Sequence, residues 1–170
     1  TIEDSLFLVD ELKNISLKAN KKLLIYISMA FGNPYNEDYS PEIVFKYIDK
    51  LSNMGINYFT LADTIGSANI ELIKIILNGL DFQKYDFGVH FHSDSDSSYL
   101  KIEEAYKYGC RRFDSTISGI GGCPFAKNEL VGNISTQTLL NFIQNNRIQH
   151  NLNLLHFESS CNNAKDLFKY

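Results

Sequence analysis

Residues 87–92 read Phe-Gly-Val-His-Phe-His, the pattern of a buried β-strand that ends in two histidines. Residues two apart in a strand point to the same face. His90 and His92 can therefore present two imidazoles to one ion, while Phe91 turns to the opposite face. Residues 118–125, Ser-Gly-Ile-Gly-Gly-Cys-Pro-Phe, place a cysteine on a glycine-rich loop, where its thiol and the backbone can both approach a ligand. A metal site that faces a thiol suits lyase chemistry on a carbonyl compound.

Similar strand signals recur along the chain and alternate with helical patterns. Strands are predicted to start near residues 23, 56, 87 and 112, and the last is expected to run from Arg112 to Ile117. This spacing predicts consecutive β-α units, a parallel sheet and a single domain over residues 1–170. Four such units form either a small open sheet or half of an eight-unit barrel. The polar candidates all follow strands, as in the TIM barrel, which favours the half barrel. An open doubly wound sheet binds ligands at the same edge, so this choice stays open.

The composition excludes several classes of protein. The chain has 170 residues, is 44% hydrophobic and 21% charged, and carries a net charge of -4 with a pI near 5.5. This is a globular composition without the basic surface of a nucleic-acid-binding protein, so no nucleic acid is expected as a partner. No apolar run reaches the length needed to span a membrane. Three scattered cysteines predict a reducing compartment rather than a disulfide framework.

Each candidate residue also has a structural interpretation. His90 and His92 could be half-buried strand residues that only bond to their neighbours, but a same-face pair at the end of a strand favours binding of an ion such as Mn²⁺, Co²⁺ or Zn²⁺. Asp63, before Thr64 and Gly66, could cap the following turn or point a carboxylate into the site. Asn133, after Gly132, could be a turn residue or a neutral metal ligand.

The three cysteines are expected to differ in role. Cys123 lies between Gly122 and Pro124, where its thiol can reach a substrate and a nearby dication could lower its pKa. Cys110 follows Gly109 and leads into a strand, which indicates a core position. Cys161 lies in the middle of a predicted helix and is expected to be structural.

Several motifs together resemble a known family. These are Leu-Ala-Asp-Thr-Ile-Gly at residues 61–66, His-Phe-His at 90–92, Gly-Gly-Cys-Pro-Phe-Ala at 121–126, and Gly-Asn at 132–133. They resemble the C-terminal half of 3-hydroxy-3-methylglutaryl-CoA lyase, a metal-dependent TIM-barrel enzyme related to Claisen-type condensing enzymes. The Asp-Thr-Ile-Gly and His-x-His motifs also occur in isopropylmalate-type and homocitrate-type synthases. The Gly-Gly-Cys-Pro loop is the motif characteristic of the lyases.

The resemblance implies a fold, a reaction and a set of site residues. The fold would be the last four β/α units of a TIM barrel. His90, His92 and Asn133 would bind a divalent cation, Mg²⁺ or Mn²⁺, while Cys123 and Asp63 would be catalytic. The substrate would be an acyl-CoA that is cleaved to acetyl-CoA and acetoacetate in leucine breakdown or ketone-body formation. The complete enzyme would be a homodimer without membrane contacts, and we expect a cytoplasmic location.

The resemblance also implies that part of the site lies elsewhere. In the family, an adjacent Arg and Asp on the first barrel strand and a Glu on the second contribute to the site. The matching portion here begins after the fourth strand, and the first residue is Thr rather than Met. We therefore expect this chain to be part of a longer polypeptide and to be inactive alone. The alternatives are a condensing synthase of the same superfamily and a non-catalytic metal-binding remnant.

Overall fold

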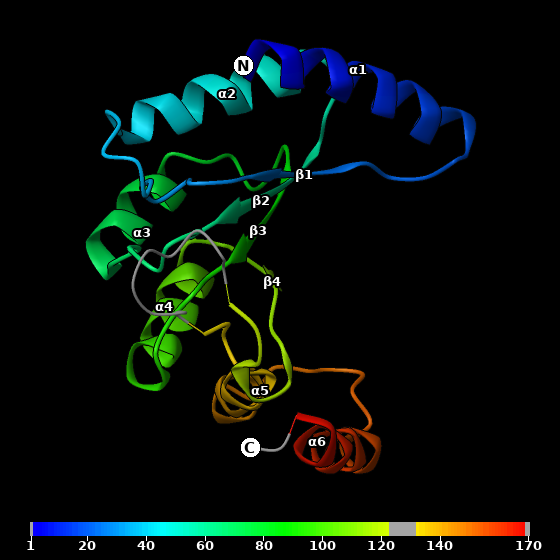
Figure 1. Cartoon of the computed structure of the whole chain (residues 1–170), viewed down its shortest axis with the longest axis vertical. Coiled ribbons are helices and arrows are strands. Elements are labelled where there is room, and N and C mark those ends of the chain that lie inside the picture. Colours follow the sequence, from blue (N-terminus) through cyan, green and yellow to red (C-terminus); the bar gives the residue numbers. More distant parts are fainter. Residues whose placement is uncertain (1, 123–131, 169–170) are drawn as a thin grey trace.

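The fold is a parallel sheet of four strands, each followed by helical segments (Figure 1). The computed structural model describes residues 2–122 and 132–168. The elements in chain order are α1 (Ile2–Lys18), β1 (Leu24–Ile27), α2 (Pro41–Asn53), β2 (Tyr58–Ala62), α3 (Ile70–Asn78), β3 (Asp86–His90), α4 (Ser95–Lys107), β4 (Arg112–Phe113), the 3-10 turn η1 (Ile117–Gly119), α5 (Thr136–Asn145) and α6 (Leu154–Phe168). The strands pair in the order β1-β2-β3-β4. The predicted parallel arrangement of consecutive β-α units is confirmed.

Local sequence signals explain where the helices begin and end. The side chain of Asn69 caps α3 by accepting a hydrogen bond from the amide of Leu72 at 2.8 Å. Ser135 caps α5 in the same way, and Pro41 occupies the first turn of α2. Gly55 ends α2 with a φ of 88°, a left-handed conformation that glycine adopts without strain.

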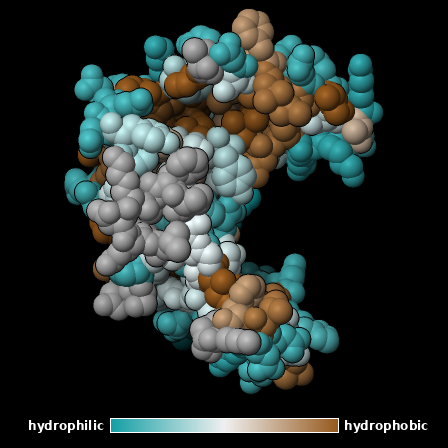
Figure 2. Space-filling view, in the orientation of Figure 1, coloured by the Kyte–Doolittle hydropathy of each residue, from teal (hydrophilic) through white to brown (hydrophobic). Residues whose placement is uncertain are grey.

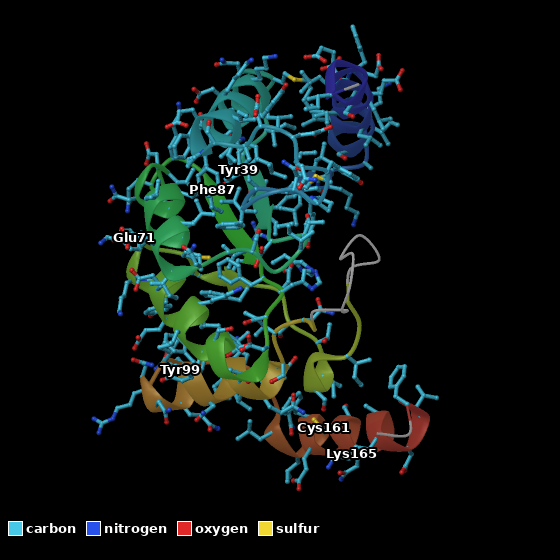
Figure 3. The ribbon with its side chains drawn as sticks, turned by 60° about the vertical axis from the view of Figure 1, so that its left-hand side comes forward. Tyr39, Glu71, Phe87, Tyr99, Cys161 and Lys165 are labelled. Atoms are coloured by element: carbon cyan, nitrogen blue, oxygen red, sulfur yellow. The ribbon has the colours of Figure 1, made fainter. Side chains whose placement is uncertain are left out.

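The convex face of the sheet carries the hydrophobic core. Alternate residues of the strands point toward α2, α3 and α4, which lie along this side of the sheet (Figure 1). Tyr99 of α4 (labelled in Figure 3) in turn packs against Phe142 of α5, with ring centroids 5.6 Å apart. Most of the fully buried core side chains come from these strands and helices: Phe59, Leu61, Ile73, Ile76, Leu77, Val89, Ile102 and Phe142.

The concave face of the sheet is polar. Tyr26, Thr60, Gly88 and Arg112 form one row across the four strands by their register. Arg112 lies along this row and donates hydrogen bonds to Thr60 Oγ1 and to the carbonyl oxygen of Phe59, both at 2.6 Å. The space-filling view shows that the molecule is hollowed on this side (Figure 2). A half barrel explains this concave polar surface, because every second residue of each strand points to the inner face of the barrel.

Two predicted strands are shorter than the sequence indicates. The strand expected to reach His92 ends at His90, because His92 leaves the sheet and pairs with Asn133 instead. The strand expected from Arg112 to Ile117 keeps only two residues in the ladder. Beyond it, Thr116 pairs with Ser135, so the chain after β4 bonds to the segment that leads into α5.

Helix α1 contributes no buried residue and displays several large apolar side chains. Figure 2 shows hydrophobic surface gathered over this end of the molecule, around α1, α2 and β1. Within residues 2–122 and 132–168, no helix is both long and apolar enough to cross a membrane.

Candidate active site

The candidate residues meet at the carboxyl ends of neighbouring strands. Asp63 directly follows β2, His90 is the last residue of β3, and Asp114 directly follows β4. Asp63 donates its amide to the carbonyl oxygen of His90 at 2.9 Å, and Asp114 donates its amide to that of Val89 at 3.0 Å. These backbone bonds align the three strand ends. In a parallel β/α fold, this edge is where ligands bind.

The two histidine rings lie side by side. Their centroids are 5.0 Å apart and their planes meet at 74°. The His92 residue is 5% exposed, whereas the His90 side chain is 29% exposed. Phe91, between the two histidines in the sequence, points into the core, where the centroid of its ring lies 5.5 Å from that of Phe31. The side chains of residues 90–92 thus alternate between the two faces as the sequence predicts, although His92 lies outside the strand.

Asn133 joins the histidines through the backbone. It pairs with His92 in an antiparallel bridge, and its side-chain amide donates to the carbonyl oxygen of Ile120 at 3.1 Å. A Cβ atom on Gly119 would lie 2.8 Å from the carbonyl oxygen of Asn133, so only glycine lets the loop pack this closely. A polar cavity of about 410 Å³ opens beside Asn133 and is also lined by Ser93, Asp94, Ser118, Gln137 and Thr138.

The three cysteines differ in where they lie in the structure. Cys123 lies outside the described residues, but its neighbour Gly122 pairs with Gly132, which directly precedes Asn133. Cys110 is completely buried, and burial raises the pKa of its thiol to about 11, so the predicted core position is confirmed. Cys161 is partly exposed on α6, at the end of the molecule away from β1 (Figure 3).

Asp63 is held by a buried ion pair. Its side chain is completely buried, and Oδ2 lies 3.2 Å from the Lys101 ammonium, while Oδ1 accepts the amide of Ala68 at 3.0 Å. The same ammonium donates to the carbonyl oxygen of His92 at 2.9 Å. Burial raises the pKa of the Asp63 carboxyl, and the positive charge of Lys101 opposes that rise. These contacts fit the interpretation of Asp63 as a structural cap, and its catalytic role stays a prediction.

A second carboxylate lies beside His90. Oδ2 of Asp114 is 3.3 Å from Nδ1 of His90 and accepts the phenolic hydroxyl of Tyr26 at 2.6 Å. The hydrogen bond with His90 lowers the pKa of Asp114, and donation to this carboxylate raises the pKa of Tyr26. Asp114 is therefore an ionised acceptor at neutral pH.

Sequence analysis missed Asp114, Tyr26 and Lys101, for which the sequence pattern holds only partial signals. Asp114 lies inside the strand predicted from Arg112 to Ile117, and only the early end of β4 in the structure places it at a strand end. Tyr26 is the one residue of β1 whose side chain carries a polar group, but its hydrogen bond to Asp114 across the sheet depends on the curvature of the sheet. Lys101 shows no pattern in its helix, because its partners lie on other elements.

The donors present account for part of a metal site. Among the described residues, no three His, Cys, Asp or Glu side chains gather closely enough to hold an ion. His90, His92 and Asn133 supply two imidazoles and one amide oxygen, which are donor types suited to a divalent cation. The amide nitrogen of Asn133 is already occupied by Ile120, so its oxygen is the atom left for a ligand. The set fits a cation that takes its remaining ligands from elsewhere.

Fold and site together define a partial TIM barrel whose polar residues lie at the carboxyl ends of its strands. The profile of the HMGL-like family matches residues 8–162, and the chain belongs to this family. The family and the barrel predicted from the motifs are both confirmed.

Curated relatives and solved structures support the same family assignment. Hydroxymethylglutaryl-CoA lyase YngG of Bacillus subtilis is 31% identical over 153 residues, covering 89% of this chain and 51% of the relative. The mitochondrial hydroxymethylglutaryl-CoA lyase of Pongo abelii is 30% identical over 91% of this chain and 48% of its own length. The chain therefore spans about half the length of the curated relatives it matches.

Among solved structures, the HMG-CoA lyase of Bacillus subtilis superposes with a TM-score of 0.87 at 28% identity, covering 98% of this chain and 56% of that one. An HMG-CoA lyase from Acinetobacter baumannii, in complex with coenzyme A and 3-methylmalate, gives a TM-score of 0.86 at 28% identity. It covers 100% of this chain and 56% of the other.

Proposed function

We propose that this chain supplies the second half of a divalent-metal-dependent lyase that cleaves 3-hydroxy-3-methylglutaryl-CoA to acetyl-CoA and acetoacetate. The observation that carries this proposal is the convergence of His90, His92 and Asn133 at the ligand-binding edge of a barrel in the HMGL-like family. The coenzyme A in the Acinetobacter baumannii complex supports an acyl-CoA substrate.

In this proposal, His90, His92 and Asn133 hold a Mg²⁺ or Mn²⁺ ion. When bound, such a cation would supply Lewis acidity to the oxygen atoms of the substrate. Its remaining protein ligands come from the barrel half that this chain does not span. Two imidazoles and an amide oxygen suit Mg²⁺ or Mn²⁺ when the remaining ligands are oxygen atoms.

The chain's own residues orient the substrate and move protons. Loss of the tertiary hydroxyl proton turns that carbon into the ketone of acetoacetate as the carbon–carbon bond breaks. The bonding electrons pass to the acetyl-CoA fragment as an enolate, which then takes up a proton. We assign this proton delivery to Cys123, because a thiol is a stronger acid than a serine hydroxyl.

A chimera tests the function directly. The first half of the Bacillus subtilis relative, which this chain does not cover, is joined to residues 1–170 and assayed with 3-hydroxy-3-methylglutaryl-CoA and Mn²⁺. We expect acetoacetate, and we expect Cys123→Ser to reduce turnover strongly with little change in substrate binding. Cys161→Ser is the matched control and should retain turnover, because Cys161 lies on α6.

The products also separate the alternatives. A folded chimera that binds Mn²⁺ but forms no acetoacetate contradicts the lyase. Condensation of acetyl-CoA with a keto acid instead supports a synthase of the same superfamily. A chimera with neither reaction supports a metal-binding remnant.

A further inference from the structure

One carboxylate oxygen is shared by two donors at the mouth of the half barrel. Oδ2 of Asp114 lies 2.6 Å from the Tyr26 hydroxyl and 3.3 Å from Nδ1 of His90. The side chains of His90 and Asp114 are 29% and 27% exposed, so solvent screens their contact only in part. Asp114 follows β4, His90 ends β3, and Tyr26 belongs to β1, so three strands meet at this oxygen.

The chemistry of the shared oxygen fixes the proton on the histidine. An ionised carboxylate can only accept hydrogen bonds. Tyr26 donates its hydroxyl proton, and Nδ1 of His90 must likewise carry a hydrogen to bond to the same atom. A neutral imidazole has one N–H, so Nε2 of His90 then keeps its lone pair.

The orientation of the ring follows from the same contacts. The amide of Asp114 is bonded to the carbonyl oxygen of Val89 at 3.0 Å, which fixes the carboxylate beside the end of β3. The rings of Tyr26 and His90 also form a T-shaped pair, with centroids 6.3 Å apart and planes at 72°. With Nδ1 turned toward Asp114, Nε2 points to the opposite side of the ring.

We propose that Asp114 is a positioning residue that holds His90 as its Nδ1–H tautomer, with Nε2 presented to the cation, and that Tyr26 orients Asp114. This inference rests on the proposed metal site and adds residues outside its ligand set. Carboxylates that bond to the second nitrogen of a metal-binding histidine fix its tautomer and raise its basicity, and their loss typically weakens metal binding about 10- to 100-fold.

Imidazole ¹⁵N NMR on the metal-free chain tests the tautomer at about pH 8.5, where an ordinary imidazole is neutral. His90→Gln assigns the His90 resonances. We expect the wild-type ring to carry its proton on Nδ1, Asp114→Ala to give a mixture of tautomers, and Asp114→Glu to restore Nδ1–H. Asp86→Ala is the matched control, because Asp86 is a carboxylate on the same sheet that pairs with Arg112 instead. A wild-type proton on Nε2, or no change in Asp114→Ala, overturns the positioning role.

A Mn²⁺ titration of the chimera, read from the broadening of the His90 and His92 imidazole signals, supplies the second readout. We expect the dissociation constant to rise about 10- to 100-fold in Asp114→Ala and to stay unchanged in Asp86→Ala. Equal affinity in Asp114→Ala and wild type also overturns the positioning role. If Mn²⁺ broadens neither histidine of the wild-type chimera, the metal site itself fails. The tautomer is measured without metal, so the two failures are distinguishable.

Discussion

Tyr26 donates its hydroxyl to Asp114 at 2.6 Å although the two residues are 88 positions apart, on or directly after the two outer strands of the sheet. β1 and β4 are not neighbours in the sheet, so a flat sheet would keep these side chains apart. They meet because both project from the concave face of a curved sheet. The hydrogen bond thus links the edges of the half barrel directly across its mouth.

Tyr26→Phe removes this link without changing the size of the ring. We expect the free energy of unfolding to fall by about 0.5–1.5 kcal/mol, the usual net contribution of one hydrogen bond. Urea denaturation followed by circular dichroism measures the change. Tyr35→Phe is the matched control, since Tyr35 is 50% exposed, like Tyr26 at 49%, but its hydroxyl forms no hydrogen bond with any residue that the structure describes. An equal, negligible loss in both variants would contradict a structural role for the Tyr26 hydroxyl.

Lys101→Met leaves the buried carboxylate of Asp63 without its cation. We expect a loss of about 3–5 kcal/mol in urea denaturation, because breaking a buried ion pair exposes an uncompensated charge to a poorly solvating interior. The double variant Asp63→Asn/Lys101→Met should recover part of this loss. Lys107→Met is the control: Lys107 forms exposed ion pairs with Glu103 and Glu104, and such pairs contribute less than about 1 kcal/mol. Similar losses in both single variants would refute the buried pair.

The sequence predicted the architecture because its signals are local. Strand starts depend on residues close in the chain, and so do the helix ends that the structure shows at Asn69, Ser135 and Gly55. The side-by-side histidines follow from the period of two in a strand, and the structure places their rings 5.0 Å apart. The structure thus bears out the parallel β-α architecture, while the role of the two histidines as metal ligands stays a prediction.

The sequence could not predict contacts that depend on curvature and on the path of the chain after each strand. The bond between Tyr26 and Asp114 requires a curved sheet, and the bridge between His92 and Asn133 ends a strand that the sequence pattern continues. Lys101 reaches Asp63 from a different element, 38 positions away. Such long-range partners leave no periodic signal in either segment.

Cys110 should resist alkylation in the folded chain. Burial raises the pKa of its thiol to about 11, so the reactive thiolate is scarce at about pH 8, and no solvent reaches the side chain. We expect iodoacetamide to modify Cys161 but not Cys110, and to modify both in concentrated urea. Peptide mass spectrometry measures the modification. Rapid labelling of Cys110 in the native chain would contradict its core position.

The same thiol gives a pH dependence of stability. The unfolded thiol has the ordinary cysteine pKa of 9.0, whereas burial raises the pKa of the folded thiol to about 11. The folded state binds more protons between these values, so its stability should fall as the pH rises through this window. Urea denaturation at about pH 8 and about pH 11 measures the slope, and Cys110→Ala should make it shallower. An unchanged slope would show that other groups cause the alkaline loss.

Gly88 makes room for the guanidinium of Arg112 on the concave face. A Cβ atom at Gly88 would lie 2.6 Å from Cζ of Arg112, whose nitrogens are bonded to Thr60, Phe59 and Asp86. The guanidinium cannot withdraw without losing these bonds, so we expect Gly88→Ala to cost about 1–3 kcal/mol of unfolding free energy. A double-mutant cycle with Arg112→Met isolates the cause. Gly88→Ala should cost less once the guanidinium is absent, and an equal cost in both backgrounds would place the strain elsewhere in β3.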